Sequence, residues 1–222
     1  MERHVLVVFP HPDDETFGTG GTIASFTKAG VPVTYACGTL GQMGRNMGKP
    51  FFATRETLSE VREKELRAAC DALGIKDLRL LGLRDKTIEF EDREVIADQL
   101  LSIIEELNPS LIITHYPGFA VHPDHNALGA ACVRAVEKLP VAKRPVVYGH
   151  AFARNREEFI GSPDVTIDIH DVAETKLEAV RAHRSQSENV IARFEEALKN
   201  KEAAAQFGPS MFTESFYTMK FA

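Results

Sequence analysis

The sequence predicts an α/β protein with a mainly parallel, doubly wound sheet of the Rossmann-like kind. Short apolar runs alternate with longer helical stretches along all 222 residues, which is the pattern of β-α-β units. The run at 5–9 (VLVVF) is apolar throughout and the run at 110–114 (SLIIT) is mainly apolar, which is typical of central strands covered on both faces. The composition, 44% hydrophobic and 26% charged, fits a single globular domain over residues 1–222.

The expected elements follow one another along the chain, and glycine or proline marks the ends of several helices. Strands are expected at 5–9, 31–37, 78–81, 110–114, 146–152 and 165–169. Helices are expected at 22–29, 54–73, 91–107, 123–138 and 173–200. Gly30 and Gly74 follow the first two helices, Asn108-Pro109 stops the third, and Pro123 opens the fourth. The glycine-rich segment 38–48 is expected to be a mobile loop.

The charge and the cysteines limit the classes of partner. Acidic residues outnumber basic ones by 32 to 26, and the net charge of −6 argues against nucleic-acid and anionic-membrane partners. Cys37, Cys70 and Cys132 show no CxxC spacing, which favours a reducing compartment. The N-terminal apolar run is too short for a signal peptide or a membrane span. We therefore expect a cytoplasmic protein that acts on a small molecule.

Two clusters of metal-ligand residue types follow two of the predicted strands. HPDDE (residues 11–15) comes directly after the first strand, and HPDH (residues 122–125) follows the strand at 110–114. Ligand sites in open α/β sheets lie beyond the carboxyl ends of the strands, so these clusters are expected to meet. His11, one aspartate of the Asp13-Asp14 pair and His125 would then supply a catalytic zinc site.

The remaining residues of the two clusters have roles in this hypothesis as well. The aspartate that does not bind the metal would be the base that activates water. His122 would be an acid or an oxyanion-stabilising group, with Asp124 holding its ring and raising its pKa. Zn²⁺ suits two histidines and one aspartate, and Fe²⁺ or Mn²⁺ would suit them too.

Other interpretations of the same residues are available. Each cluster alone could be a polar turn or a capped helix start. The segment 18–23 (GTGGTI) loosely resembles a dinucleotide-binding fingerprint, but Ile23 replaces its third glycine and no ribose-binding acid follows the second strand. A regulatory metal-binding protein is a further alternative, although it would need neither the second aspartate nor His122.

The motifs together resemble the PIG-L/LmbE-like zinc-dependent N-deacetylases. Beyond HPDDE and HPDH, the resemblance extends through Arg62-x-x-Glu65 and through Lys176-x-x-Ala179-x-x-x-His183-x-Ser185-Gln186. The arrangement is most similar to the bacillithiol-biosynthesis deacetylase branch. The resemblance implies an LmbE-like fold, removal of an acetyl group from an N-acetylglucosaminide, and N-acetylglucosaminyl-malate as the substrate. An amidase of thiol conjugates and a chitobiose-type deacetylase are the alternatives within this class. Relatives are often homo-oligomers.

The resemblance also assigns the site residues one by one. It implies His11, Asp14 and His125 as metal ligands, Asp13 as the general base, His122 as the group that stabilises the intermediate or protonates the amine, and Asp124 as its orienting partner. Arg62 and Asp85 would bind the substrate. From the sequence alone, Arg62 could instead pair with Glu65 on the helix surface, and Asp85 could open a turn. His115 would be a packed residue and His183 a structural hydrogen-bonding group. The family often has glutamate where this chain has Gln42.

Overall fold

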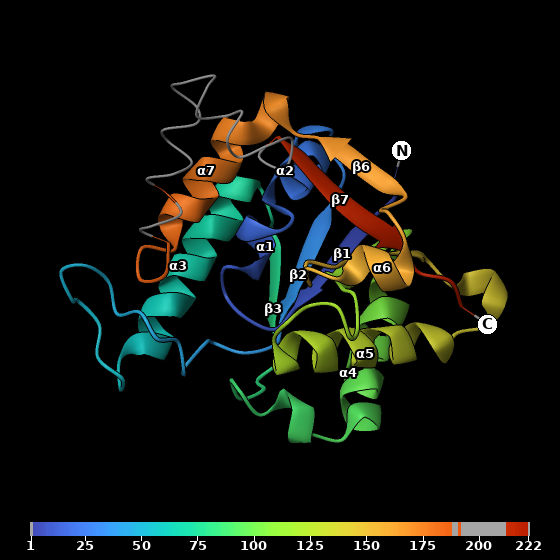
Figure 1. The fold of residues 1–222 in the computed structure, drawn as a ribbon, viewed down its shortest axis with the longest axis horizontal. Coiled ribbons are helices and arrows are strands. Elements are labelled where there is room, and N and C mark those ends of the chain that lie inside the picture. The colour runs from blue at the N-terminus through green and yellow to red at the C-terminus, as the bar shows by residue number, and fades with distance from the viewer. Residues whose placement is uncertain (1, 188–190, 192–211, 222) are drawn as a thin grey trace.

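A mainly parallel sheet forms the centre of the molecule (Figure 1). The computed structural model describes residues 2–187, 191 and 212–221, and within them the sheet has seven strands in the order β3-β2-β1-β4-β5-β7-β6. Their bounds are β1 Val5–Phe9, β2 Val33–Cys37, β3 Asp77–Leu80, β4 Leu111–His115, β5 Val146–His150, β6 Val165–Asp168 and β7 Thr213–Thr218. The strands from β3 to β5 in this order run parallel, and β7 is antiparallel to β5 and β6. The predicted α/β class is confirmed.

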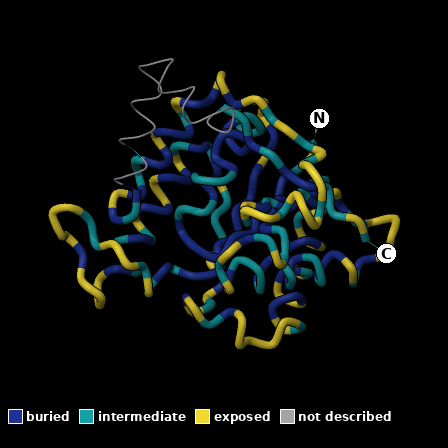
Figure 2. Tube along the Cα trace, in the orientation of Figure 1, coloured by how far each residue is buried: buried dark blue, intermediate teal, exposed yellow. Residues whose placement is uncertain are grey.

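Helices cover both faces of the sheet, as expected for a doubly wound fold. Their bounds are α1 Asp14–Phe17, α2 Gly20–Lys28, α3 Leu58–Leu73, α4 Arg93–Leu107, α5 Pro123–Glu137, α6 Arg156–Ile160 and α7 Ala173–Ala182. Three short 3₁₀ turns lie at Ile88–Phe90, Val141–Lys143 and His170–Val172. Side chains of β1 alternate between two cores: Val7 packs with residues of α2, α3 and α7, whereas Leu6 packs with residues of α4 and α5. Figure 2 shows the buried centre between these layers.

Several elements differ from the sequence-based expectation, among them the short helices α1 and α6, which were not predicted. The helix predicted over 173–200 ends at Ala182, and residues 188–190 and 192–200 of that range lie outside the described residues. The helix ends there because the chain turns so that the side chains of His183 and Ser185 bond to buried carboxylates of other helices. Strand β7 is a further difference, because the sequence analysis predicted no element over 213–218.

The order of the strands places the ends of β1 and β4 at a switch point. The two strands are neighbours in register, with Val5 opposite Leu111 and Val8 opposite Thr114. The chain leaves β1 toward β2 on one side and leaves β4 toward β5 on the other, which opens a crevice at their carboxyl ends. Within the described residues, no helix is long and apolar enough to cross a membrane.

Candidate metal centre and active site

Three side chains from the two motifs bring ligand atoms together at the switch point. Nδ1 of His11 lies 3.1 Å from Nε2 of His125 and 3.3 Å from Oδ2 of Asp14. Oδ1 of Asp14 lies 3.2 Å from Nε2 of His125. His11 follows β1 directly and Asp14 begins α1, while His125 lies in the first turn of α5. The predicted convergence of HPDDE and HPDH is therefore confirmed.

The chemistry and spacing of these donors fit a divalent metal ion. Ligand atoms at 2.0–2.1 Å from a tetrahedral ion are about 3.3 Å apart, which is close to the 3.1 Å between the two imidazole nitrogens. Each of these nitrogens lies at a similar distance from a different carboxylate oxygen of Asp14. The opposite ring nitrogens also have partners: Nδ1 of His125 lies 3.0 Å from the carbonyl oxygen of Ala120, and Nε2 of His11 lies 3.2 Å from carboxylate oxygens of both Asp85 and Asp124. Such partners leave the lone pairs of Nε2 of His125 and Nδ1 of His11 for a cation.

Electrostatics keep the carboxylate of Asp14 ionised. Burial raises the pKa of Asp14, but the His125 charge and hydrogen bonds from neighbouring histidines outweigh burial and hold the pKa well below its usual value. An ionised carboxylate is the form that binds a metal. Among the described residues, three groups have ligand atoms close enough to hold a metal, and each contains at least one member of this cluster: His11, His122 and His125; Asp14, His115 and His125; and His11, Asp85 and Asp124.

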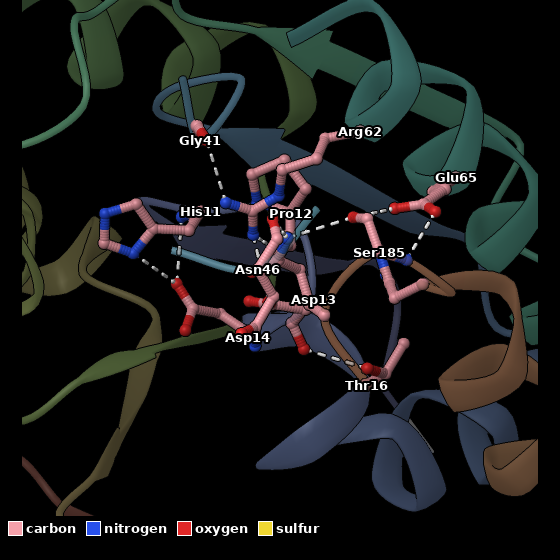
Figure 3. A network of polar contacts seen from close by, with 12 residues as sticks. His11, Pro12, Asp13, Asp14, Thr16, Gly41, Asn46, Arg62, Glu65 and Ser185 are labelled. Atoms are coloured by element: carbon pink, nitrogen blue, oxygen red, sulfur yellow. Dashed lines mark hydrogen bonds and ion pairs between the residues drawn. The ribbon is translucent and has the colours of Figure 1, made fainter. Parts of the chain in front are cut away.

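Asp13 lies beside this cluster but bonds elsewhere. Asp13 and Arg62 lie together in Figure 3, and Oδ2 of Asp13 is 3.0 Å from Nη2 of Arg62. The backbone of Asp13 has a positive φ of 103°, which non-glycine residues rarely adopt. Burial, opposed by the Arg62 charge, raises the pKa of Asp13 to about 6. A carboxylate with this pKa and no role as a ligand fits a general base working near neutral pH.

His122 is the N-cap residue of α5, and its contacts correct one expectation. The sequence analysis placed the carboxylate of Asp124 on the ring of His122, with a raised pKa. Instead, the backbone N–H of Asp124 donates to Nδ1 of His122 at 3.2 Å, and burial, helped by the charges of His11 and His125, lowers the pKa of His122. The carboxylate of Asp124 accepts a hydrogen bond from the backbone N–H of Lys86 and lies 3.2 Å from Nε2 of His11.

Arg62 and Asp85 both lie at the site, but in contacts that the sequence did not indicate. The interpretation of Arg62 as the partner of Glu65 in a surface ion pair is wrong, since Arg62 is only 4% exposed and pairs with Asp13. Its guanidinium also donates to the carbonyl oxygens of Pro12 and Gly41. Asp85 accepts from the backbone N–H of the loop residue Met43 at 2.7 Å and faces His11. A direct substrate role for either residue stays a prediction.

Gly41 explains why the glycine-rich segment 38–48 can approach Arg62 so closely. Its φ is +61°, and a Cβ atom there would lie 1.9 Å from Nη1 of Arg62. The loop is therefore in contact with the guanidinium that holds Asp13.

Several functional residues were missed or undervalued by the sequence analysis. His115, expected to be merely packed, stacks on the ring of His125 with centroids 4.1 Å apart, and its Nε2 is 3.8 Å from Asp14. A cavity of ≈ 930 Å³ borders Asp14 and His125 and is also lined by His150 and Lys176. That volume lies in the range of small-molecule sites. His115 follows the strand predicted at 110–114, and Lys176 begins the C-terminal motif quoted for the resemblance, but neither signal showed that the side chain borders this cavity.

The fold and the site first define a class: doubly wound α/β proteins with two histidines and an aspartate arranged for a metal at the switch point. Comparison with known proteins then gives the family. Residues 6–136 match the PIG-L family model, described as GlcNAc-PI de-N-acetylase, and the chain belongs to this family. The resemblance stated from the motifs is thus confirmed.

Individual relatives agree with this assignment. The chain is 57% identical over 220 residues, 99% of each chain, to the probable N-acetyl-alpha-D-glucosaminyl L-malate deacetylase 2 of Bacillus cereus. It is 55% identical over 202 residues, 91% of each chain, to the protein of the same name from Bacillus subtilis. Among solved structures, N,N'-diacetylchitobiose deacetylase from Pyrococcus horikoshii has a TM-score of 0.73 and 27% identity, over 98% of this chain and 84% of that one.

Proposed function

We propose that this protein is a metal-dependent N-deacetylase that hydrolyses the acetamide of N-acetylglucosaminyl-malate to acetate and the free amine. The observation that carries the proposal is the division of labour between adjacent acids. Asp14 lies within 3.3 Å of two imidazole nitrogens, whereas Asp13 pairs with Arg62 instead. The names of the two Bacillus relatives support the choice of substrate.

His11, Asp14 and His125 would hold the metal, with Zn²⁺ the best match and Fe²⁺ or Mn²⁺ compatible with the same donors. When bound, a divalent ion supplies a Lewis acid that polarises the acyl oxygen and lowers the pKa of water toward about 7. Asp13 accepts the proton of the attacking water, because it is held beside the ligands without being one of them.

His122 stabilises the negative charge that forms on the acyl oxygen. The N–H of Asp124 donates to Nδ1 of His122, so the neutral ring carries its own proton on Nε2. The lowered pKa of His122, caused first by burial, favours this neutral form. Nε2–H can then donate to the oxyanion, and Asp13 returns its proton to the leaving nitrogen.

The malate carboxylates need cationic partners, and Arg62 is already engaged with Asp13. Arg45 and Lys49 are exposed on the chain that continues from Gly41, and we assign them to the malate group. Their replacement by alanine should raise the KM for the malate substrate and leave kcat unchanged, since they act on binding alone.

An amine-release assay tests the proposed function. The protein is assayed as purified, after chelator treatment, and after refilling with Zn²⁺, Fe²⁺ or Mn²⁺, on N-acetylglucosaminyl-malate, N,N'-diacetylchitobiose and N-acetylglucosamine. We expect the highest kcat/KM on the malate conjugate. Activity should be lost after chelator treatment and recovered when the metal is added back. Equal or higher kcat/KM on either uncharged sugar would contradict the substrate. Metal binding without turnover of any acetamide would favour a regulatory metal-binding protein.

A further inference from the structure

A buried pair of side chains holds the peptide that carries Asp13, and the proposed chemistry does not use it. Oε2 of Glu15 accepts a hydrogen bond from the backbone N–H of Asp13 at 2.9 Å. Oε1 of Glu15 lies 2.6 Å from Nε2 of His183, a residue 168 positions further along the chain. Both the Glu15 and the His183 side chains are 0% exposed.

The backbone conformation of Asp13 is unfavourable, so contacts with its surroundings must stabilise it. With φ 103° and ψ −28°, it lies outside the regions that residues with a Cβ atom prefer. Residues persist there only when their surroundings fix them. Glu15 fixes the N–H of Asp13, Thr16 donates to its carbonyl oxygen at 2.8 Å, and Arg62 holds its carboxylate at 3.0 Å.

Stability alone is a poor explanation for the Glu15–His183 pair. Removing a carboxylate and an imidazole from water is costly, and apolar side chains of similar volume serve a core as well or better. Nδ1 of His183 is buried without a hydrogen-bond partner, which adds to the cost. An apolar pair could not accept a hydrogen bond from the backbone N–H of Asp13, whereas Glu15 does. This hydrogen bond therefore explains why a polar pair occupies the position.

We propose that Glu15 and His183 are positioning residues that hold Asp13 at positive φ, with its carboxylate paired with Arg62. The proposal rests on the proposed function, because it assigns these residues to the deacetylation that Asp13 serves. His183 orients Glu15, and Glu15 fixes the Asp13 peptide; neither side chain touches the substrate.

The test compares variants that keep or remove these hydrogen bonds. Glu15→Gln keeps both of them: its carbonyl accepts from Asp13, and its amide donates to neutral His183, whose ring can carry its proton on the unpartnered Nδ1. Glu15→Met fills similar space but accepts nothing from Asp13. His183→Gln keeps a donor near the position of Nε2, and His183→Leu does not, so this second pair remains informative if Glu15→Met fails to fold.

Ser185→Ala is the matched control. Ser185 follows the same helix and donates a buried 2.6 Å hydrogen bond to Glu65, but it bonds to no atom of Asp13. This variant should lose stability through the same segment of chain and keep the wild-type kcat.

We expect Glu15→Met and His183→Leu to lower kcat about 10- to 100-fold, as misplacement of a catalytic group does. KM and metal content should stay within twofold of wild type, and Glu15→Gln and His183→Gln should retain most of the kcat. A crystal structure of Glu15→Met should show Asp13 relaxed to negative φ. The proposal would be overturned if Glu15→Met and His183→Leu kept the wild-type kcat, or if Ser185→Ala lost as much kcat as they do. Absence of turnover in the wild type would refute the proposed function instead. The φ of Asp13 in the crystal structure of Glu15→Met would still show whether Glu15 holds the Asp13 backbone.

Discussion

Nδ1 of His11 lies 3.1 Å from Nε2 of His125, although 114 residues separate them in the chain. The sheet produces this approach, because β1 and β4 are neighbours and His11 and α5 both lie beyond their carboxyl ends. Two imidazole nitrogens at this distance share either a proton or a cation. Because a proton and a metal ion compete for these nitrogens, metal binding at the site depends on pH.

The first prediction concerns the pH dependence of metal binding. Burial lowers the pKa of His11, but hydrogen bonds to Asp124, Asp14 and Asp85 outweigh burial and hold the pKa well above its usual value. The metal-free ring is therefore protonated near neutral pH and must release that proton to bind a metal. Below the pKa of His11, metal affinity should rise about tenfold per pH unit.

Calorimetry in buffers of different ionisation enthalpy measures this proton release directly. We expect at least one proton released per ion at pH 7: the proton that His11 gives up, and part of a further proton from water at the ion, whose pKa would lie near 7. His125→Ala is the control, because it removes a ligand and should lower the affinity at every pH. An affinity independent of pH between 6 and 8 would contradict the assignment of Nδ1 of His11 as a ligand.

Replacing the base should separate metal binding from turnover. Asp13→Asn keeps the size of the side chain and a possible contact with Arg62, but it cannot accept a proton. We expect kcat to fall about 10²- to 10⁴-fold, the usual contribution of a general base. Metal content, measured by elemental analysis after gel filtration, should equal that of the wild type. Loss of the metal together with activity would instead make Asp13 a ligand.

The site could be predicted from the sequence to the extent that it depends on strand ends. His11, His125 and the Asp13-Asp14 pair belong to two motifs that each follow an apolar strand, so the switch-point rule predicted their convergence. The choice of Asp14 as the ligand came from the family resemblance. The contacts of Asp124 were not predictable, because the direction of a side chain at a helix start depends on the path of the neighbouring loop. Arg62 was misjudged because a spacing of three on a helix says nothing about the loop that covers it.

The sequence predicted the parallel part of the fold better than its antiparallel edge. Continuous apolar runs identify β1 and β4 because both faces of these strands are buried. Strand β7 alternates buried and partly exposed residues, and its pairing with β5 and β6 depends on residues distant in sequence. Buried long-range partners such as Glu15 and His183 leave no local pattern for the same reason.

The loop before α5 contains a strained residue whose replacement should stabilise the protein. Val121 has φ +61°, a conformation that β-branched residues avoid, and it is 70% exposed. Asparagine tolerates this conformation, so Val121→Asn should raise the free energy of unfolding by about 1 kcal/mol. Urea denaturation measures the change, with Val121→Ala as a control that keeps the positive φ without the β-branch and should gain less. A destabilised Val121→Asn would show that the valine side chain makes contacts that compensate for its strain.

The buried ion pair beneath the cavity gives the last prediction. Nζ of Lys176 lies 2.6 Å from Oε1 of Glu214. The carboxylate of Glu214 also accepts hydrogen bonds from the backbone N–H groups of Gly21 and Thr22 at the start of α2. Lys176→Met removes one charge and leaves the Glu214 carboxylate buried, which should cost about 3–5 kcal/mol of unfolding free energy. The double variant Lys176→Met/Glu214→Gln carries no buried charge and should recover part of this loss. Denaturant unfolding of the three proteins measures both effects. A cost below about 1 kcal/mol for Lys176→Met would mean that the two N–H groups alone stabilise the carboxylate, because hydrogen bonds to a charged group are worth about 1.5–3 kcal/mol each.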